Sequence, residues 1–282
     1  MILVLGGSGL LGSALSRSLT HRGQPFVAPA RAELDLARLA ELERRIRELR
    51  PSAIVNASGF TDVAAAERPE VRDAVFLLNR DVPAALARTA AVLRVPFVHV
   101  STDYVFDGEK GSPYGEDDSV RPLQVYGVSK LEGEMRVREA DPDALIARTA
   151  TLYGATERAR PTYVDAILSQ AESERVLSVV ELPVSSPTYA PDLADWLLAL
   201  LDAGATGTVH AVNDGACSRL ELARAIVAEA GRESTVEVRR KPAPSADLRR
   251  PRNSSLSVER LASILGRRPR PWREALREYV RS

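Results

Sequence analysis

Short apolar runs alternate with longer stretches of helical pattern through the first half of the chain. The runs predict strands at residues 2–5, 25–28, 53–56, 95–101 and 144–148. The stretches between them predict helices at residues 10–19, 36–49, 71–93 and 125–140. The runs are rich in β-branched residues and nearly continuous, which is typical of parallel strands covered on both faces. We therefore expect an α/β fold with a doubly wound, Rossmann-like parallel sheet.

The regular alternation loosens after about residue 150, where Pro and Gly separate shorter segments. Start signals for helices remain, and they predict helices at residues 191–201, 218–230, 257–265 and 271–280. We interpret this half as a smaller C-terminal α/β lobe. The expected division is residues 1–150 for the main domain and residues 151–282 for the lobe, with the two interleaved.

Composition excludes several classes of protein. Apolar residues make up 45% of the chain, and 38 basic residues balance 38 acidic ones. A net charge of zero does not predict a nucleic-acid partner. No apolar run approaches the ~18 residues of a membrane span, and Met1 leads directly into an apolar run with no basic segment, so we expect a cytoplasmic protein with no membrane contact.

Cysteine and histidine give no metal site. Cys217 is the single cysteine and cannot form an intramolecular disulfide. His21, His99 and His210 are far apart in sequence and lack ligand spacing, so we expect no bound metal. Among the basic residues, only Lys110, Lys130 and Lys241 are lysines.

A glycine-rich turn joins the first expected strand to the first expected helix. It reads Gly6-Gly7-Ser8-Gly9-Leu10-Leu11-Gly12 and fits either of two glycine spacings of a dinucleotide-binding loop. In both, glycines allow a pyrophosphate to approach the backbone amides of the helix N-terminus. We therefore expect residues 1–150 to bind NAD(P).

The choice between the two dinucleotides depends on the end of the second strand. An NAD-binding unit usually places an acidic residue there to hold the ribose hydroxyls. This chain has Arg31, followed by Glu33 and Asp35. A guanidinium suits a 2′-phosphate, so we expect NADPH, with NADH as the alternative.

Tyr126 and Lys130 are four residues apart at the start of an expected helix, which places both side chains on one face. An ammonium beside a phenol lowers the pKa of the phenol, which then donates a proton near neutral pH. Lysine also reaches ribose hydroxyls as a compact donor. Thr102 ends the preceding strand, where it can hydrogen-bond a substrate oxygen beside Tyr126.

These motifs together resemble the extended short-chain dehydrogenases/reductases, and within them the dTDP-4-dehydrorhamnose reductase family. The likeness includes the glycine loop, Asn56-Ala57-Ser58, the segment 101–108 and Tyr126-x-x-x-Lys130. It continues through Arg148-Thr149, 186–194 and 250–254, so it runs nearly end to end. The resemblance implies an NAD(P)H-dependent reductase that acts on the 4-keto group of a nucleotide-linked 6-deoxyhexose.

The resemblance also implies roles for single residues. Thr102, Tyr126 and Lys130 would form the catalytic set, with Tyr126 and Lys130 also touching the cofactor. The remaining cofactor contacts would come from the glycine loop and from the ends of the second and third strands: Gly6, Gly9, Leu10, Leu11, Gly12, Arg31, Asp35, Leu36, Ala57 and Ser58. Substrate contacts would come from Thr102, Asp103, Tyr104, Val105, Phe106, Thr151, Arg250 and Asn253.

Two positions separate this chain from its relatives. Family members that dehydrate nucleotide sugars carry a second acidic residue after Asp103, whereas this chain has Tyr104, which favours reduction. Family reductases that act on rhamnose precursors usually carry an aromatic residue where this chain has Thr151, so the sugar can be a different deoxyhexose.

Two other functions remain open at this point. One is a non-catalytic NADP-binding subunit similar to the regulatory subunit of methionine adenosyltransferase. The other is a nucleotide-sugar epimerase. The intact set of Thr102, Tyr126 and Lys130 favours the reductase over the regulator, and we expect a monomer or a homodimer.

Overall fold

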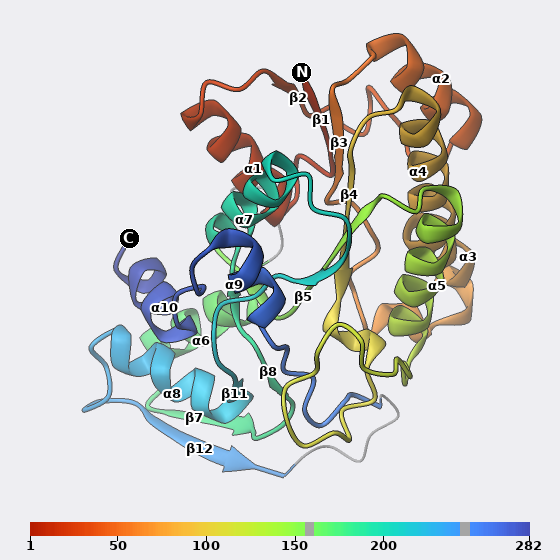
Figure 1. Cartoon of the computed structure of the whole chain (residues 1–282). Coiled ribbons are helices and arrows are strands. Elements are labelled where there is room, and N and C mark those ends of the chain that lie inside the picture. The colour runs from red at the N-terminus through yellow and green to blue at the C-terminus, as the bar shows by residue number, and fades with distance from the viewer. Residues whose placement is uncertain (156–160, 243–248) are drawn as a thin grey trace.

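A six-stranded parallel sheet forms the centre of the protein (Figure 1). The computed structural model describes residues 1–155, 161–242 and 249–282. The sheet has the order β10-β5-β4-β3-β1-β2. Its strands are β1 (Ile2–Leu5), β2 (Phe26–Val27), β3 (Ala53–Asn56), β4 (Phe97–Thr102), β5 (Leu145–Thr149) and β10 (Gly207–His210). This arrangement confirms the expected doubly wound fold.

Helices cover both faces of the sheet. On one face lie α1 (Leu10–His21), α7 (Ala190–Asp202) and α9 (Glu259–Leu265). On the other lie α2 (Leu39–Leu49), α4 (Val82–Leu93) and α5 (Val125–Ala140). Successive residues of β1 therefore enter different cores: Val4 packs with Leu15, and Leu3 packs with Leu86. Burial on both faces is the reason for the nearly continuous apolar runs.

The helix expected over residues 71–93 is a broken one. It consists of α3 (Arg72–Phe76), a π-helical turn at Leu77–Asp81, and α4. The turn contains Asn79, which is fully buried. Its amide donates to the Phe60 carbonyl at 3.1 Å and to the Ser129 hydroxyl at 3.0 Å. The irregular turn therefore ties the loop after β3 to α5.

The second half of the chain returns to the central sheet. Strand β10 pairs in parallel with β5, with Gly207 opposite Leu145. Helix α7 packs on α1 against the same sheet. A cut at residue 150 therefore does not separate two independent cores.

The small lobe has its own core, and its elements lie below α7 and α1 in Figure 1. Its helices are α6 (Tyr163–Ser173), α8 (Arg219–Glu229) and α10 (Trp272–Arg281), and its main strands β7 (Val176–Val180) and β12 (Glu237–Lys241) pair in parallel. The sequence pattern did not indicate these strands. The remaining elements are the short pairs β6 (Leu152–Tyr153) with β9 (Thr188–Tyr189) and β8 (Val184–Ser185) with β11 (Cys217–Ser218), and 3-10 turns at Ala65–Glu67, Pro69–Val71 and Asp103–Val105.

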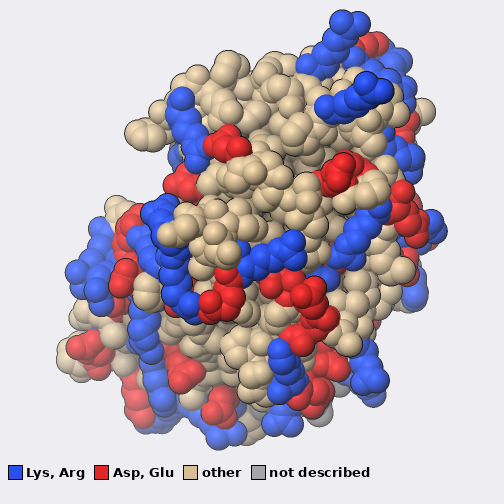
Figure 2. All heavy atoms as spheres, viewed as in Figure 1, with Lys and Arg blue, Asp and Glu red and all other residues tan. Residues whose placement is uncertain are grey.

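Acidic and basic side chains are interspersed on the face seen in Figure 2. This mixture agrees with the balanced totals of the sequence. Within the described ranges, no helix is both long and apolar enough to cross a bilayer.

Candidate active site

A cleft of about 960 Å³ opens at the carboxyl ends of the central strands. Its walls include Leu5 at the end of β1, Ser58 after β3, Thr102 at the end of β4 and Ala150 after β5. The strand order reverses at β1, and open α/β sheets bind ligands at such a point. Residues of the small lobe, such as Tyr163, close the other side of the cleft.

The glycine loop lies at one end of this cleft and is shaped for close approach of a ligand. Gly6 has φ +81°, and a Cβ there would lie 2.8 Å from the backbone of Ala57. Helix α1 follows with Gly9 at its N-cap and no capping side chain, so its first amides face the loop without a side-chain acceptor. A diphosphate fits this arrangement because it supplies the missing acceptors.

Gly12 is the point at which helix α1 packs on the glycine loop. It does not line the cleft. A Cβ at Gly12 would lie 2.1 Å from the Gly6 carbonyl oxygen, because α1 packs directly on the loop. The residue therefore sets the packing of helix on loop, and its expected cofactor contact stays a prediction.

The region after β2 adds polar side chains to the wall of the cleft that includes the glycine loop. Arg31, Asp35 and Leu36 all line it, and the Arg31 side chain is exposed. The Asp35 carboxylate accepts from the Ala37 amide at 3.1 Å, so it fixes its own turn. This leaves Arg31 available to a phosphate group.

Tyr126 and Lys130 lie on one face of α5 and both line the cleft. The buried Lys130 ammonium donates to the Val100 carbonyl at 2.7 Å. Burial lowers the pKa of Lys130 to about 8, while the charge of Glu134 opposes this shift. Lys130 therefore carries its proton at neutral pH.

Burial raises the pKa of the Tyr126 phenol above its ordinary value. The neighbouring Thr102 side chain opposes the shift. We expected Lys130 to lower this pKa, but the desolvation of the phenol dominates. Tyr126 is consequently a protonated group at neutral pH and has a proton to give.

Thr102 is held by the residue that follows it. Its hydroxyl donates to the Asp103 carboxylate at 3.0 Å and accepts from the Tyr104 amide at 3.2 Å. Asp103 is buried, and its second oxygen accepts from the Ser254 hydroxyl. Burial raises the pKa of Asp103 to about 7, with both hydroxyl contacts opposing the rise. The Asp103 carboxyl group therefore connects Thr102 to the loop that contains Ser254.

Tyr104 and Thr151 line the cleft beyond the catalytic set, and their substrate contacts stay a prediction. The Tyr104 ring stands edge-on to the Tyr126 ring, with centroids 6.0 Å apart. The Thr151 and Ser185 hydroxyls lie 2.7 Å apart. Thr151 has φ +40°, an uncommon conformation for a β-branched residue.

Four expected substrate residues do not line the cleft. Val105 and Phe106 are fully buried, and Phe106 stacks on Tyr114 with centroids 4.1 Å apart. Their side chains are part of a core, so the expectation that these side chains contact substrate is wrong. Arg250 and Asn253 are also absent from the cleft walls. The Asn253 side-chain oxygen, Oδ1, accepts from the Ser255 hydroxyl at 2.7 Å and shapes its own loop.

Sequence reasoning missed two groups that the structure brings to the site. One is the loop after β3, where Gly59, Thr61 and Asp62 join the cleft wall. The other is the pair Tyr163 and Arg219 from the small lobe. Arg219 is half-buried at the start of α8. The chain has many arginines, so the sequence does not mark this one as different from the exposed ones, and only the tertiary structure shows where it lies.

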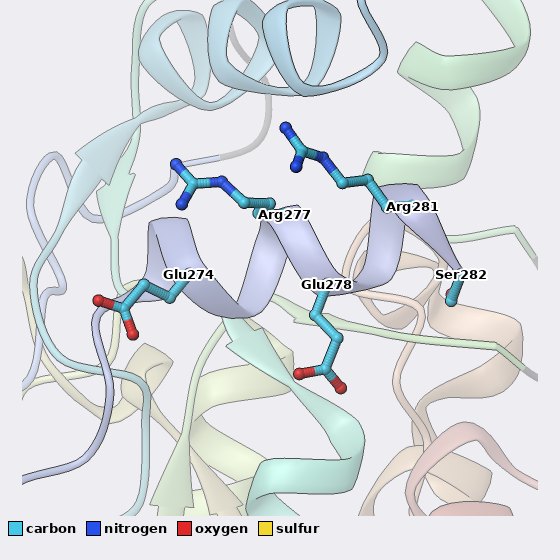
Figure 3. A pocket seen from close by; sticks show the side chains of 5 residues that line it. All are labelled: Glu274, Arg277, Glu278, Arg281 and Ser282. Carbon is cyan, nitrogen blue, oxygen red and sulfur yellow. The ribbon is translucent and has the colours of Figure 1, made fainter.

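A second hollow lies on the outer surface at α10 (Figure 3). Arg277 and Arg281 line it, and both bind the Glu229 carboxylate at 3.2 Å. Glu278 binds Arg270. These charges already have partners, so the hollow offers no chemistry comparable to that of the cleft.

The fold and the cleft define a dinucleotide-dependent reductase of the Rossmann type, with a glycine loop and a tyrosine–lysine pair in one cavity. The family model described as RmlD substrate binding domain matches residues 1–282. The chain belongs to this family, which confirms the resemblance found in the sequence.

Individual relatives agree over nearly their whole length. The chain is 38% identical over 285 residues to a dTDP-4-dehydrorhamnose reductase of Mycobacterium tuberculosis, covering 98% of this chain and 90% of the relative. It is 35% identical to the spore coat polysaccharide biosynthesis protein SpsK of Bacillus subtilis, covering 99% and 96%. The structure is similar to that of a dTDP-4-dehydrorhamnose reductase from Bacillus anthracis in complex with NADP. For that pair the TM-score is 0.89 at 28% identity, with 99% and 97% covered.

Proposed function

We propose that this protein uses NADPH to reduce the 4-keto group of a nucleotide-linked 6-deoxyhexose. The observation that carries the proposal is the meeting of Thr102, Tyr126 and Lys130 in the cleft that begins at the glycine loop. A cofactor held by that loop would extend toward the phenol. Bound NADPH supplies the hydride, and its nicotinamide is oxidised in return.

The chain's own residues supply the remaining proton and the orientation. As the hydride reaches the carbonyl carbon, the oxygen takes up negative charge and needs a proton. Tyr126 is protonated at neutral pH and gives its phenolic proton to that oxygen. The Thr102 hydroxyl sits beside Tyr126 and donates to Asp103 in this structure; on substrate binding its one proton would turn from Asp103 to the same oxygen and polarise the carbonyl. The product is the alcohol.

Lys130 acts on the cofactor side of the phenol. Its buried ammonium is one helical turn from Tyr126 and close to the position of Gly59, where a Cβ would lie 3.5 Å from its Nζ atom. A compact ammonium at this point can hold ribose hydroxyls. Its positive charge also stabilises the phenolate left after proton transfer.

Arg31 supports NADPH over NADH, since it is the exposed cation on the cleft wall nearest the end of β2. A guanidinium binds a 2′-phosphate through paired hydrogen bonds. The proposal also includes a cytoplasmic location. The protein acts as a monomer or a homodimer, and a size measurement in solution would test this oligomeric state.

The test is NADPH consumption with dTDP-4-keto-6-deoxyhexose and a matching epimerase. We expect turnover with the natural chain and its collapse in Tyr126→Phe, while NADPH binding persists in the variant. NADPH binding without turnover on any ketosugar would contradict the proposal and favour the regulatory subunit. Interconversion of sugars without net NADPH loss would favour the epimerase. The relatives named above favour neither alternative.

A further inference from the structure

The Arg219 side chain lines the cleft without an acidic partner. It shares the cavity with Thr102 and Tyr126. Within residues 1–155, 161–242 and 249–282, no carboxylate forms an ion pair with its guanidinium, whereas Arg270 binds both Asp192 and Glu278. Among the residues that the structure describes, Arg80, Arg148 and Arg270 are also at least half-buried, and each of these has an acidic partner.

The surrounding structure holds Arg219 in place. Ser218 and Glu221 form a capping box, so the first amides of α8 are already satisfied and the backbone enters the helix at a fixed angle. The Arg219 amide donates to the Pro183 carbonyl at 3.2 Å. Its carbonyl accepts from the Tyr163 hydroxyl at 3.0 Å. The guanidinium then lies over the Tyr163 ring, 4.6 Å from its centroid.

The Arg219 guanidinium is a partly desolvated positive charge. Burial lowers the pKa of Arg219, and the neighbouring positive charge of Arg250 lowers it further. Burial and the Asp103 carboxyl raise the pKa of the Tyr104 phenol, and the charges of Arg250 and Arg219 oppose that rise. A half-buried cation that a second cation further destabilises is unfavourable unless an anion binds it.

The position of Arg219 is on the small-lobe side of the catalytic tyrosine. Tyr104 is near both residues, since its ring contacts the Tyr126 ring edge-on and the charge of Arg219 lowers the pKa of its phenol. Thr151 belongs to the same wall, because Ser185 binds its hydroxyl and pairs in register with Cys217, two residues before Arg219. The glycine loop, by contrast, belongs to the large body of the protein.

We propose that Arg219 binds the diphosphate of the nucleotide-sugar substrate and so selects for a sugar carried on a nucleoside diphosphate. This inference rests on the proposed function. A 6-deoxyhexose carries no charge, so the diphosphate is the anionic group that such a substrate brings to this wall. The planar guanidinium matches two phosphate oxygens at once, and its stacking on Tyr163 orients that fork in advance.

Calorimetric binding tests the proposal without turnover. The probes are dTDP, UDP, the corresponding nucleosides and NADPH. For whichever diphosphate binds the natural chain, Arg219→Gln weakens binding about ten- to one-hundred-fold, and Arg219→Lys recovers part of the loss. The affinities for the nucleoside and for NADPH stay unchanged. Arg224→Gln, an exposed position on the same helix, leaves all affinities unchanged.

Three results would overturn the assignment: no diphosphate binding to the natural chain, an unchanged diphosphate affinity in Arg219→Gln, or an equal loss for the nucleoside. The proposed function is judged separately by NADPH consumption. If the natural chain turns over substrate normally and Arg219→Gln binds the diphosphate as tightly as the natural chain, the role of Arg219 is overturned and the proposed function stands. A selective loss of diphosphate binding without turnover of any ketosugar overturns the reductase alone.

Discussion

The Glu134 carboxylate binds the Arg148 guanidinium through two hydrogen bonds, at 2.9 and 2.7 Å, in the interior of the protein. Both side chains are almost completely buried. The Ser101 hydroxyl donates to the same carboxylate at 2.6 Å. This network joins α5, β4 and β5 directly behind the cleft, with Thr102 following Ser101 and Lys130 one turn before Glu134.

Replacing Glu134 with Gln should strongly destabilise the fold. The change leaves Arg148 buried without a counter-charge, which costs about 3–5 kcal/mol of unfolding free energy. Urea denaturation followed by circular dichroism measures the loss. The control is Glu139→Gln on the same helix, whose ion pair with Arg136 is exposed and should cost about 0.5 kcal/mol or less. An equal loss of unfolding free energy in the two variants would show that the buried ion pair stabilises the fold no more than the exposed one.

Replacing Gly12 with Ala should impair both folding and cofactor binding. The new methyl group would meet the Gly6 carbonyl oxygen at 2.1 Å, so α1 must move off the glycine loop. We expect about 1–3 kcal/mol of destabilisation, together with weaker NADPH binding measured by fluorescence titration. Gly115→Ala is the matched control, because its Cβ meets its nearest neighbour at an ordinary 3.7 Å. Unchanged NADPH affinity in Gly12→Ala would contradict the tight helix–loop contact.

The large body of the fold follows from local pattern, whereas the small lobe does not. Strands such as β1 and β4 are short apolar runs flanked by helices, so burial on two faces marks them in the sequence. Strand β12 is mostly exposed and rich in charge, and only its pairing with β7 makes it a strand. Tertiary pairing of this kind leaves no periodic signal.

The same division applies to the site. The glycine loop and the Tyr126–Lys130 pair are local motifs, and the structure brings both to one cleft. Val105 and Phe106 belong to the segment that carries the family likeness, but adjacency to Thr102 says nothing about which way a side chain points. The direction of the Tyr126 pKa shift also depends on burial, which the spacing to Lys130 does not encode.

Replacing Arg31 with Ala should reduce the preference for NADPH over NADH. The exposed guanidinium would otherwise bind a 2′-phosphate, and its loss should lower the ratio of kcat/KM values about tenfold. The drop should arise mainly through KM for NADPH, with NADH nearly unaffected. Arg38→Ala serves as the control, since Arg38 pairs with Asp35 and Glu41 and does not line the cleft. A parallel loss with both cofactors would argue against a role in selection.

Asp103 should make stability fall as pH rises toward neutrality. Its pKa in the fold, about 7, is above its unfolded value, so the folded state binds the proton more tightly. This contribution is complete below pH ~4 and is lost as pH rises through about 7. Asp103→Asn keeps a hydrogen-bonding group of similar shape without the titration. We expect the variant to gain stability relative to the natural chain between pH 5 and pH 8, by roughly 4 kcal/mol at most.

Denaturation at a series of pH values measures this difference. Asp143→Asn, an exposed position, corrects for general effects of charge removal and should follow the natural chain. A constant difference between Asp103→Asn and the natural chain from pH 5 to pH 8 would mean that Asp103 does not titrate in this range.

Lys130 should give NADPH binding a pH limit on the alkaline side. Burial lowers its pKa to about 8, so the ammonium is present below that pH and is lost above it. Because the proposed ribose contact needs the charged donor, the dissociation constant for NADPH should rise as pH passes through about 8. Lys130→Met should bind more weakly at pH 7 and should lose this transition. Lys110→Gln removes a cation whose partner is Asp118, outside the cleft, and should keep the transition. A transition near pH 8 that survives in Lys130→Met would assign it to another group.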